Sequence, residues 1–421
     1  MAKIKKIFAR EIIDSRSFPT VEAWMALDNG HEVVTSVPAG TSIGKYEARE
    51  LRDNDPDRFD GMGVTQAVNL INTSFAPKLI GVDPLRQKEV DEWLVKANEG
   101  ANQKLGANTT LAISQLVLKA GADSQNLPLF KYVNSIFKNI FQSEVKVQKI
   151  PTPIFNLING GKHANNNLDI QEFQLIPSSR FTFSQAYELG VELFHEIKKV
   201  LEYRNANISV GEEGGFAPNL SKNIDALEIL NESIIRRSLR PGMEVFLGMD
   251  MAASHYYIDH RYVIRDKQEP LNRDEYINFV KELLKTYAFM TLEDPLNQDD
   301  FDGWAKLNKE IEKKVYLIGD DLLVTNKDKL QKAIKDKSCN AILIKPNQIG
   351  TITQTLEVVN VAKQNDFTCV VSHRSGETND DLIADFAVGI QADFVKFGAP
   401  SRGERVAKYN RLWQIEKEEL K

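Results

Sequence analysis

The sequence holds little cysteine and no long apolar run, and each absence excludes a class of protein. Only two cysteines, Cys339 and Cys369, occur in 421 residues. They are too few for a disulfide framework, and each lies in an apolar run, so we expect buried free thiols in a reducing compartment. No apolar stretch approaches the length that spans a membrane. Near the N-terminus, Arg10, Glu11 and Asp14 interrupt the apolar segment that a signal peptide needs, which favours a cytoplasmic protein.

An excess of basic residues is also missing. The 53 lysines and arginines are outnumbered by 59 aspartates and glutamates, which gives a formal net charge of −6. A general nucleic-acid binder normally shows a basic face, so we expect no nucleic-acid partner. The glycine-rich stretches match neither GxxxxGKS/T nor GxGxxG, and the sequence has no HExxH pair. These absences argue against a nucleotide site and against a zinc hydrolase.

The first third of the chain reads as strands followed by helices. Thr20–Leu27 is strand-like, and the pair Asn29–Gly30 before HEVVTSV is typical of a hairpin turn. Further along, apolar residues recur at helical spacing. Strands first and helices afterwards indicate a compact α+β unit. We therefore expect an N-terminal α+β domain over residues 1–140 and a barrel domain over residues 141–421.

The second part repeats short apolar runs that end in an ionisable residue and lead into charged, helical text. The endings are Asp250, Glu293, Asp320, Lys345, His373 and Lys396. From Glu293 onward they lie 23 to 28 residues apart, the length that one strand and one return helix need in a (β/α)8 barrel. We expect a parallel barrel, although an open doubly wound sheet would alternate in the same way. In a barrel the carboxyl ends of the strands meet at one face, so these side chains would surround one mouth.

Three of these endings are carboxylates whose mutual repulsion favours a bound cation. Asp250, Glu293 and Asp320 would raise one another's pKa if nothing compensated their charge. A divalent cation relieves this repulsion, and ligands that are all oxygen favour Mg²⁺ over zinc. The alternative is a plain ring of ion pairs with the nearby cations Lys345, Lys396 and Arg374.

Lys345 ends the buried, strand-like run NAILIKPN, where it would either extend into water or act as a base. Beside a metal, and partly buried, its charged form would be disfavoured and its pKa lowered, and the same holds for Lys396. The next strand end, HRSG, offers the guanidinium of Arg374 and the hydroxyl of Ser375. Such a pair is typical of a clamp for phosphate or carboxylate.

A second polar set comes from the first units of the predicted barrel. His163 lies in the glycine-rich loop of INGGKHANNNLDIQEF, and Gln171 and Glu172 follow on a strand. The stretch GEEGGFAPN adds Glu212 and Glu213. A base, a metal set, an anion clamp and separate carboxyl groups together fit proton abstraction beside a carboxylate, followed by acid-assisted loss of a hydroxyl.

The order and spacing of the longer motifs resemble those of the enolase family over nearly the whole chain. The matching stretches are DSR..PTVE, GTSIGKYEARELRD, KLGANTTLAIS, FNLINGGKHANNNLDIQEF, GEEGGFAPN, GMDMAAS, LEDPLNQDDFDGW, GDDLLVTN, IKPNQIGT, VVSHRSGET and SRGERVAKYN. The resemblance implies a small N-terminal α+β domain and a C-terminal TIM-type barrel whose first units have an atypical topology. It also implies reversible dehydration of 2-phosphoglycerate to phosphoenolpyruvate, a step of glycolysis and gluconeogenesis.

The resemblance further implies two Mg²⁺ ions per active site, the second arriving with substrate. By position, Asp250, Glu293 and Asp320 match the ligands of the first ion. Ser42, in a mobile loop over residues 39–44, matches the residue that joins the second ion.

The remaining positions match groups that act on the substrate. Lys345 matches the base that takes the C2 proton, and Glu213 matches the acid, with Glu172 and Gln171 beside it. Lys396 matches the contact to the substrate carboxylate. The implied phosphate shell consists of His163, Arg374 and Ser375, with His373 next to it.

The sequence also departs from the usual family pattern close to these positions. The substituted residues are Ser17, Phe18, Ala39, Thr41, Ile43, Glu212, Pro346, Phe397 and Gly403. None of them removes a residue with an implied role in chemistry. Because a shift of about 1 Å can cost roughly a hundredfold in rate, we expect an active but slower, divergent member.

Assembly and two other functions complete the expectations. The resemblance implies at least a homodimer formed largely through the N-terminal domain, with an octamer left open. A related acid-sugar dehydratase is disfavoured, because such enzymes generally lack the Glu172/Glu213 pair and the His163 loop. A binding role is the other alternative, since enolases can reach cell surfaces and bind plasminogen through lysines, and this chain ends in Lys421. A solvated helix end explains that tail more simply.

Overall fold

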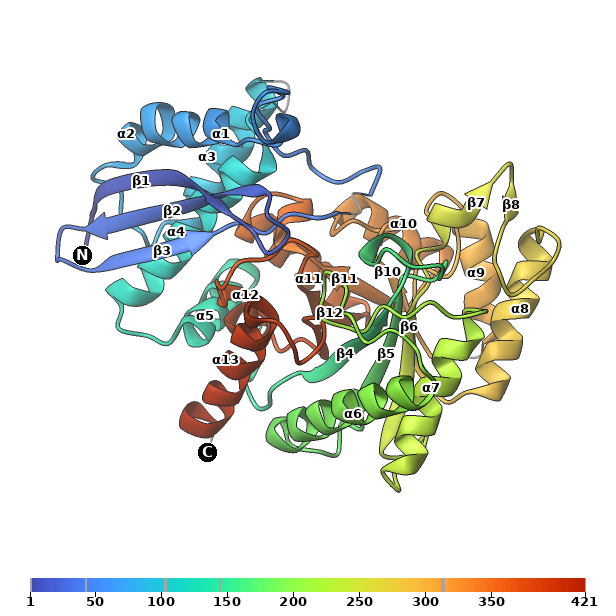
Figure 1. The fold of residues 1–421 in the computed structure, drawn as a ribbon. Coiled ribbons are helices and arrows are strands. Elements are labelled where there is room, and N and C mark those ends of the chain that lie inside the picture. The colour runs from blue at the N-terminus through green and yellow to red at the C-terminus, as the bar shows by residue number, and fades with distance from the viewer. Residues whose placement is uncertain (1, 42–43, 102–103, 144, 312–314, 421) are drawn as a thin grey trace.

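The computed structural model describes residues 2–41, 44–101, 104–143, 145–311 and 315–420. A small antiparallel sheet with its helices lies at one end of the molecule, beside a closed barrel (Figure 1). The structure therefore confirms the predicted α/β class, with an α+β part followed by a barrel. No helix within the described ranges combines the length and the apolar character that a bilayer crossing requires.

The N-terminal sheet has three antiparallel strands in the order β1 (Ile4–Ile13), β2 (Pro19–Leu27) and β3 (Glu32–Ser36). The predicted hairpin joins β2 to β3, where Gly30 adopts a φ of +90° that glycine reaches without strain. Alternate side chains such as Val21 and Met25 are buried on one face, while Phe8 and Val34 are exposed on the other.

In the part of the chain that the structure describes, the sheet is followed by the helices α1 (Thr65–Leu70), α2 (Ala76–Leu79), α3 (Gln87–Gly100), α4 (Ala107–Ser124) and α5 (Leu129–Phe141). A π-helical turn over Ile71–Phe75 joins α1 to α2. Helix α4 is buried nearly all round its axis, because it packs against β2 and β3 on one side and against α11 (Ile352–Gln364) of the barrel on another. A helix that is buried on every face suits such a position between two layers.

The barrel closes with the strand order β10-β11-β12-β13-β4-β5-β6-β9. The strands are β4 (Thr152–Asn159), β5 (Glu172–Pro177), β6 (Val245–Asp250), β9 (Phe289–Glu293), β10 (Tyr316–Gly319), β11 (Ala341–Ile344), β12 (Thr368–Ser372) and β13 (Phe394–Lys396). Strand β5 is antiparallel to both neighbours, and the other pairings are parallel. The reversal of β5 confirms the atypical first units.

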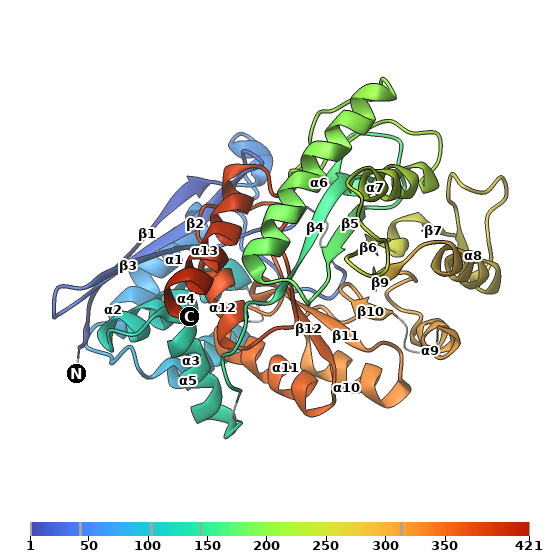
Figure 2. The same cartoon turned by 90° about the horizontal axis from the view of Figure 1, so that it is seen from below.

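Helices surround the strands (Figure 2). Besides α11 they are α6 (Phe183–Tyr203), α7 (Ile224–Arg236), α8 (Arg273–Thr286), α9 (Phe301–Glu310), α10 (Lys327–Asp336), α12 (Leu382–Gly389) and α13 (Gly403–Glu419). A small hairpin, β7 (Tyr257–Ile258) and β8 (Arg261–Tyr262), precedes α8. Capping boxes start α6 at Thr182 and α8 at Asn272, where side chains satisfy amides that the first turn leaves unpaired.

The interior of the barrel contains its own apolar cluster, formed by Ile154, Ile176, Ile318, Ala341, Leu343, Val370 and Phe394. The polar strand ends lie beyond this cluster, so the barrel is a packed support for them and not a pore.

The N-terminal part packs closely on the barrel. The amide of Phe130 on α5 donates to Asp385 on α12, and Asn134 donates to the carbonyl of Gly389. Helix α5 ends at Phe141 and β4 begins at Thr152. The division at residues 140 and 141 stays a prediction.

Candidate active site

The predicted strand ends lie together at one end of the barrel. The Nζ atom of Lys396, at the end of β13, lies 2.7 Å from an oxygen of Glu293 and 3.6 Å from one of Asp250. The Nζ atom of Lys345, directly after β11, lies 2.5 Å from Oδ2 of Asp320. A small cavity between the strands is lined by His163, Gln171, Glu172, Glu213, Asp250, Lys345, Ser372, His373, Arg374, Ser375 and Lys396.

Glu172 reaches this cavity because β5 runs against its neighbours. As the first residue of β5, it pairs in register with Asp250, the last residue of β6. Its carboxylate accepts a hydrogen bond from Lys396 at 3.2 Å. The preceding Gln171 donates to Asp250 at 3.2 Å. The reversal of β5 thus places Gln171 and Glu172 at the end of the barrel where the parallel strands have their carboxyl ends.

Both lysines pair with carboxylates in this structure and their pKa values are raised, while the lowering expected beside a bound metal stays a prediction. Burial lowers the pKa of Lys345, but the carboxylate of Asp320 outweighs it and the pKa is raised. For Lys396, burial is outweighed by Glu172, Glu293 and Asp250, and its pKa lies well above the usual value. The two ammonium groups therefore offset part of the negative charge of the carboxylates. These contacts belong to the ring of ion pairs that the sequence left open as the alternative to a metal site.

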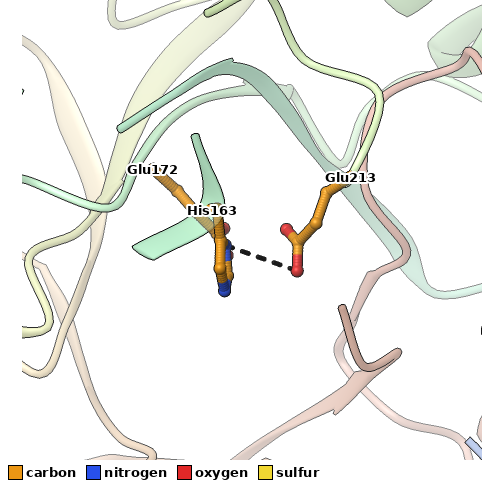
Figure 3. A group of neighbouring side chains, drawn as sticks. All are labelled: His163, Glu172 and Glu213. Carbon is orange, nitrogen blue, oxygen red and sulfur yellow. Dashed lines mark ion pairs between the residues drawn. The ribbon is translucent and has the colours of Figure 1, made fainter. Parts of the chain in front are cut away.

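On the far side of the cavity, His163 lies between two buried glutamates (Figure 3). Its Nδ1 atom is 3.5 Å from Glu172 and 3.4 Å from Glu213. Burial would lower the pKa of His163, but Glu213 and Glu172 outweigh it and raise the pKa to about 10. Burial would also raise the pKa of Glu213, but His163 and His373 hold it well below the usual value. The proton of this group resides on His163.

The ring of His373 faces the same carboxylate from the opposite direction. Its Nε2 atom is 3.4 Å from Glu213, and its Nδ1 atom is 2.7 Å from Nη1 of Arg405. A guanidinium only donates, so Nδ1 must accept. Burial lowers the pKa of His373, and the neutral ring then carries its proton on Nε2, toward Glu213. Glu213 also accepts a hydrogen bond from Asn156 at 2.8 Å.

Arg374 and Ser375 occupy the loop after β12, as predicted for an anion clamp. The side chain of Arg374 is 3 % exposed and forms two hydrogen bonds with the carboxylate of Glu47, at 2.8 and 3.2 Å. It also donates to Asn347 at 2.9 Å. Ser375 accepts a hydrogen bond from the amide of Thr41 at 2.7 Å. Residues of the barrel and of the N-terminal part thus meet at Arg374 and Ser375, and binding of an anion there stays a prediction.

The buried carboxylates suit a divalent cation. Burial, together with Glu172 and Asp320, raises the pKa of Asp250 to about 6, although Lys396 opposes the shift. Burial and Asp250 raise the pKa of Glu293 well above its usual value. Lys396 relieves this repulsion only in part, and oxygen donors held together in this way are the ligands that Mg²⁺ prefers. Among the described residues, two groups of three have possible ligand atoms that all lie within 4.8 Å of one another: His163, Glu172 and Glu213, and Asp294, Asp320 and Asp321. The predicted set of Asp250, Glu293 and Asp320 shares only Asp320 with them.

The start of the predicted mobile loop, residues 39–41, is attached to the end of the barrel that holds the cavity. Ala39 pairs with Gly376 through backbone hydrogen bonds. The hydroxyl of Thr41 accepts from Arg16 at 2.7 Å and donates to Glu212 at 2.6 Å. Ser42, predicted to bind a metal, lies outside the described residues.

Comparison with known proteins decides the family. The model of the enolase C-terminal TIM barrel domain matches residues 147–421, and that of the enolase N-terminal domain matches residues 4–133. The chain is 42 % identical over 416 residues to the enolase of Ehrlichia canis, covering 99 % of this chain and 96 % of the relative. It is 41 % identical over 415 residues to the enolase of Ehrlichia chaffeensis, covering 98 % and 96 %. The chain belongs to the enolase family. As an enolase-family member it is a lyase of the phosphopyruvate hydratase type.

Some residues of this enolase-family site were not found from the sequence. Glu47 and Asn156 contact Arg374 and Glu213 directly. Arg405, fully buried on α13, donates to the carbonyls of Arg374 and Ser375 and to His373. Glu47 and Arg405 lie in charged stretches typical of solvated surface, so local composition gave no sign of their burial. Their presence in motifs shared with the family was the available signal.

Proposed function

We propose that this chain catalyses the reversible dehydration of 2-phosphoglycerate to phosphoenolpyruvate in glycolysis and gluconeogenesis. One observation carries the proposal: a single cavity is lined by a lysine from one side of the barrel and by a glutamate–histidine group from the other. Lys345 follows β11, and Glu172 begins β5, which lies across the closed barrel from β11. Removing a proton from one carbon and a hydroxyl from the next requires a base and an acid placed in this way.

Lys345 is the proposed base for the C2 proton. A base needs a free electron pair, so the ammonium group must first lose its proton and its contact with Asp320. Burial of Lys345 already favours the neutral amine, and Asp320 opposes it. A positive charge that replaces the ammonium group as the partner of Asp320 would therefore allow Lys345 to lose its proton and act as the base.

Glu213 is the proposed acid that helps the C3 hydroxyl leave, together with Glu172. Because its pKa is held low, Glu213 delivers a proton only in concert with His163, which carries one. We propose that the glutamate and the histidine act as one unit, with Asn156 fixing the carboxylate. His163, expected in the phosphate shell, acquires this second role from its contacts.

Asp250, Glu293 and Asp320 are the proposed ligands of a first Mg²⁺ ion. When bound there, Mg²⁺ would polarise the substrate carboxylate and make the C2 proton more acidic. A second ion that arrives with substrate, with Ser42 as its ligand, is part of the proposal. Lys396 is the proposed partner of the substrate carboxylate. Its ammonium group lies among three carboxylates, which raise its pKa and keep it charged.

Arg374 and Ser375 are the proposed phosphate contacts, with His373 beside them. Arg405 holds this loop by its backbone carbonyls, so the side chains project from a fixed support. Guanidinium groups bind phosphate through paired N–H donors, which gives orientation as well as charge.

A cytoplasmic homodimer is the proposed form of the enzyme, with an octamer left open. The outer face of the N-terminal sheet supports this, since Phe8 and Val34 are 48 % and 46 % exposed there and Trp24 lies between them in register. Plasminogen binding at a cell surface remains a secondary proposal, and Lys421 lies outside the described residues. Sedimentation that shows only monomer would contradict the dimer.

The test is phosphoenolpyruvate formation from 2-phosphoglycerate by the purified protein, with and without Mg²⁺, alongside Lys345→Ala. We expect magnesium-dependent turnover that the substitution abolishes. Absence of turnover in the parent protein would contradict the proposal and favour another acid substrate or a binding role.

A further inference from the structure

Glu47 is a buried carboxylate that the N-terminal part inserts beside the end of the barrel. Its side chain is 4 % exposed, and both of its oxygens accept from Arg374. Oε1 also accepts from the amide of Gly44 at 2.9 Å and from Gln348 at 3.3 Å. Because these bonds are buried with the ion pair, their loss is costly.

Gln348 continues this contact toward the proposed base and metal ligand. Its amide nitrogen donates to Asp320 at 2.9 Å, and its oxygen accepts from the hydroxyl of Thr325 at 2.7 Å. The same hydroxyl accepts from the backbone amide of Lys345 at 2.9 Å. Gln348 and Thr325 are fully buried or nearly so. Thr325 has a φ of +49°, a strained conformation for a β-branched residue that these bonds help to hold.

The backbone near Glu47 is fitted to the same region. A Cβ atom added at Gly44 would lie 2.7 Å from Oδ1 of Asp321 and 3.1 Å from the side chain of Val324. The amide of Ala48 donates to the carbonyl of Gln348 at 2.9 Å. The segment therefore sits against the β10 and β11 loops through main-chain as well as side-chain contacts.

We propose that Glu47, acting with Gln348, is a positioning residue for the reaction assigned above, on which this inference rests. Through Arg374 it sets the anion clamp. Through Gln348 it sets Asp320 and, by way of Thr325, the backbone of Lys345. One carboxylate from the N-terminal part thereby aligns groups that follow three neighbouring barrel strands, β10, β11 and β12.

The alternative is that Glu47 merely balances the charge of Arg374. The two roles predict opposite effects of Glu47→Gln, which keeps the shape of the side chain and removes its charge. Loss of a nearby negative charge alone would strengthen binding of an anion at Arg374. Loss of alignment would weaken it, because the amide offers Arg374 only one acceptor in place of two.

The experiment measures kcat and KM for 2-phosphoglycerate, and calorimetric binding of inorganic phosphate, in the full-length protein. For Glu47→Gln we expect kcat/KM to fall by about a hundredfold and phosphate to bind more weakly. For Gln348→Met, which replaces one uncharged side chain by another of similar length, we expect a lower kcat with phosphate affinity little changed. Glu50→Gln is the control for charge, since Glu50 pairs with Arg52 in the same segment and acts on Arg374 only through its charge.

Circular dichroism and thermal melting establish that each variant is folded. If Glu47→Gln does not fold, Gln348→Met carries the test alone. Unchanged kcat with tighter phosphate binding in Glu47→Gln, or values like those of Glu50→Gln for both variants, would overturn the inference. A parent protein without turnover would contradict the proposed function instead, and phosphate binding would still test the alignment of Arg374.

Discussion

The Nζ atom of Lys345 lies 2.5 Å from Oδ2 of Asp320, and each side chain is 12 % exposed. The proposed base is therefore the ion-pair partner of a proposed metal ligand. Neither charge is free while the pair persists, and each stabilises the other in a region crowded with carboxylates. The pair therefore affects both the stability of the protein and the protonation of its proposed base.

Replacing Lys345 by Met should destabilise the protein when divalent metal is absent. The substitution leaves the carboxylate of Asp320 without its partner, and loss of one member of a buried pair typically costs about 3–5 kcal/mol. We expect this loss in urea unfolding with EDTA, and partial recovery of stability with Mg²⁺ but no recovery of turnover. Lys285→Met, which removes an exposed pair with Glu282, should change the free energy of unfolding by less than about 1 kcal/mol. Equal stability of Lys345→Met and the parent in EDTA would contradict the prediction.

The charged His163 should make the metal-free protein less stable in alkaline solution. Its folded pKa of about 10 exceeds the ordinary value of 6.5. The stabilisation is therefore complete below pH 6.5 and is lost as the pH rises from there through 10. We expect the free energy of unfolding to decline over this range by a few kcal/mol, since one pKa unit corresponds to about 1.4 kcal/mol. His163→Gln should flatten that decline in denaturant titrations at several pH values, and identical slopes in the two proteins would refute it.

The barrel and most of the site were predictable because parallel strands bring their carboxyl ends to one face. Polar residues that end successive strands at a regular interval are therefore also expected to lie close together in space. Glu172 broke that rule, since it begins the reversed strand β5, and the family resemblance indicated only that the first units of the barrel are atypical. The reversal depends on pairing with β4 and β6, which no local pattern reports.

Partners distant in the sequence explain what could not be predicted. Lys345 and Asp320 are 25 residues apart, and the sequence left open whether this carboxylate would pair with the lysine or bind a metal. Glu47 lies 327 residues from Arg374, in a segment where Lys45 and Arg49 look equally polar. Composition cannot tell which of several neighbouring charges is buried, because burial is decided by the docking of the two parts.

Two residues that depart from the family pattern contact each other, and removing this contact should slow the enzyme. Thr41 bridges Arg16 and Glu212, and Glu212 precedes the proposed acid. Thr41→Val keeps the shape of the side chain and removes both hydrogen bonds. A hydrogen bond to a charged group contributes about 1.5–3 kcal/mol at most. Because Thr41 is exposed, we expect kcat/KM to fall by no more than about tenfold. Thr73→Val, which removes an exposed hydroxyl bonded within its own helical segment, should leave the rate unchanged. Equal rates for Thr41→Val and the parent would show that the bridge has no effect on turnover.

Asp380 joins the two parts of the molecule and should be required for stability. It lies before α12 and accepts from Lys119 on α4 at 2.9 Å and from Thr35 and Ser36 on β3 at 2.8 and 3.0 Å. Burial raises the pKa of Asp380, but Lys119 and these hydrogen bonds outweigh it and the pKa is lowered. Its contribution is therefore present above the ordinary pKa of 3.8 and is lost as the pH falls through the folded value.

Asp380→Asn should lower the free energy of unfolding at pH 7 by about 2–4 kcal/mol, because it leaves Lys119 without its charged partner. The difference from the parent should shrink in acid below about pH 4. The adjacent Asp381 is a matched control of opposite sign. Burial and repulsion by Asp380 raise its pKa, so its ionised form costs stability at neutral pH and Asp381→Asn should be neutral or stabilising. Denaturant titrations of both variants at pH 7 and pH 3.5 measure the contrast, and equal losses at pH 7 would mean that position in the loop, and not the pairing with Lys119, determines stability.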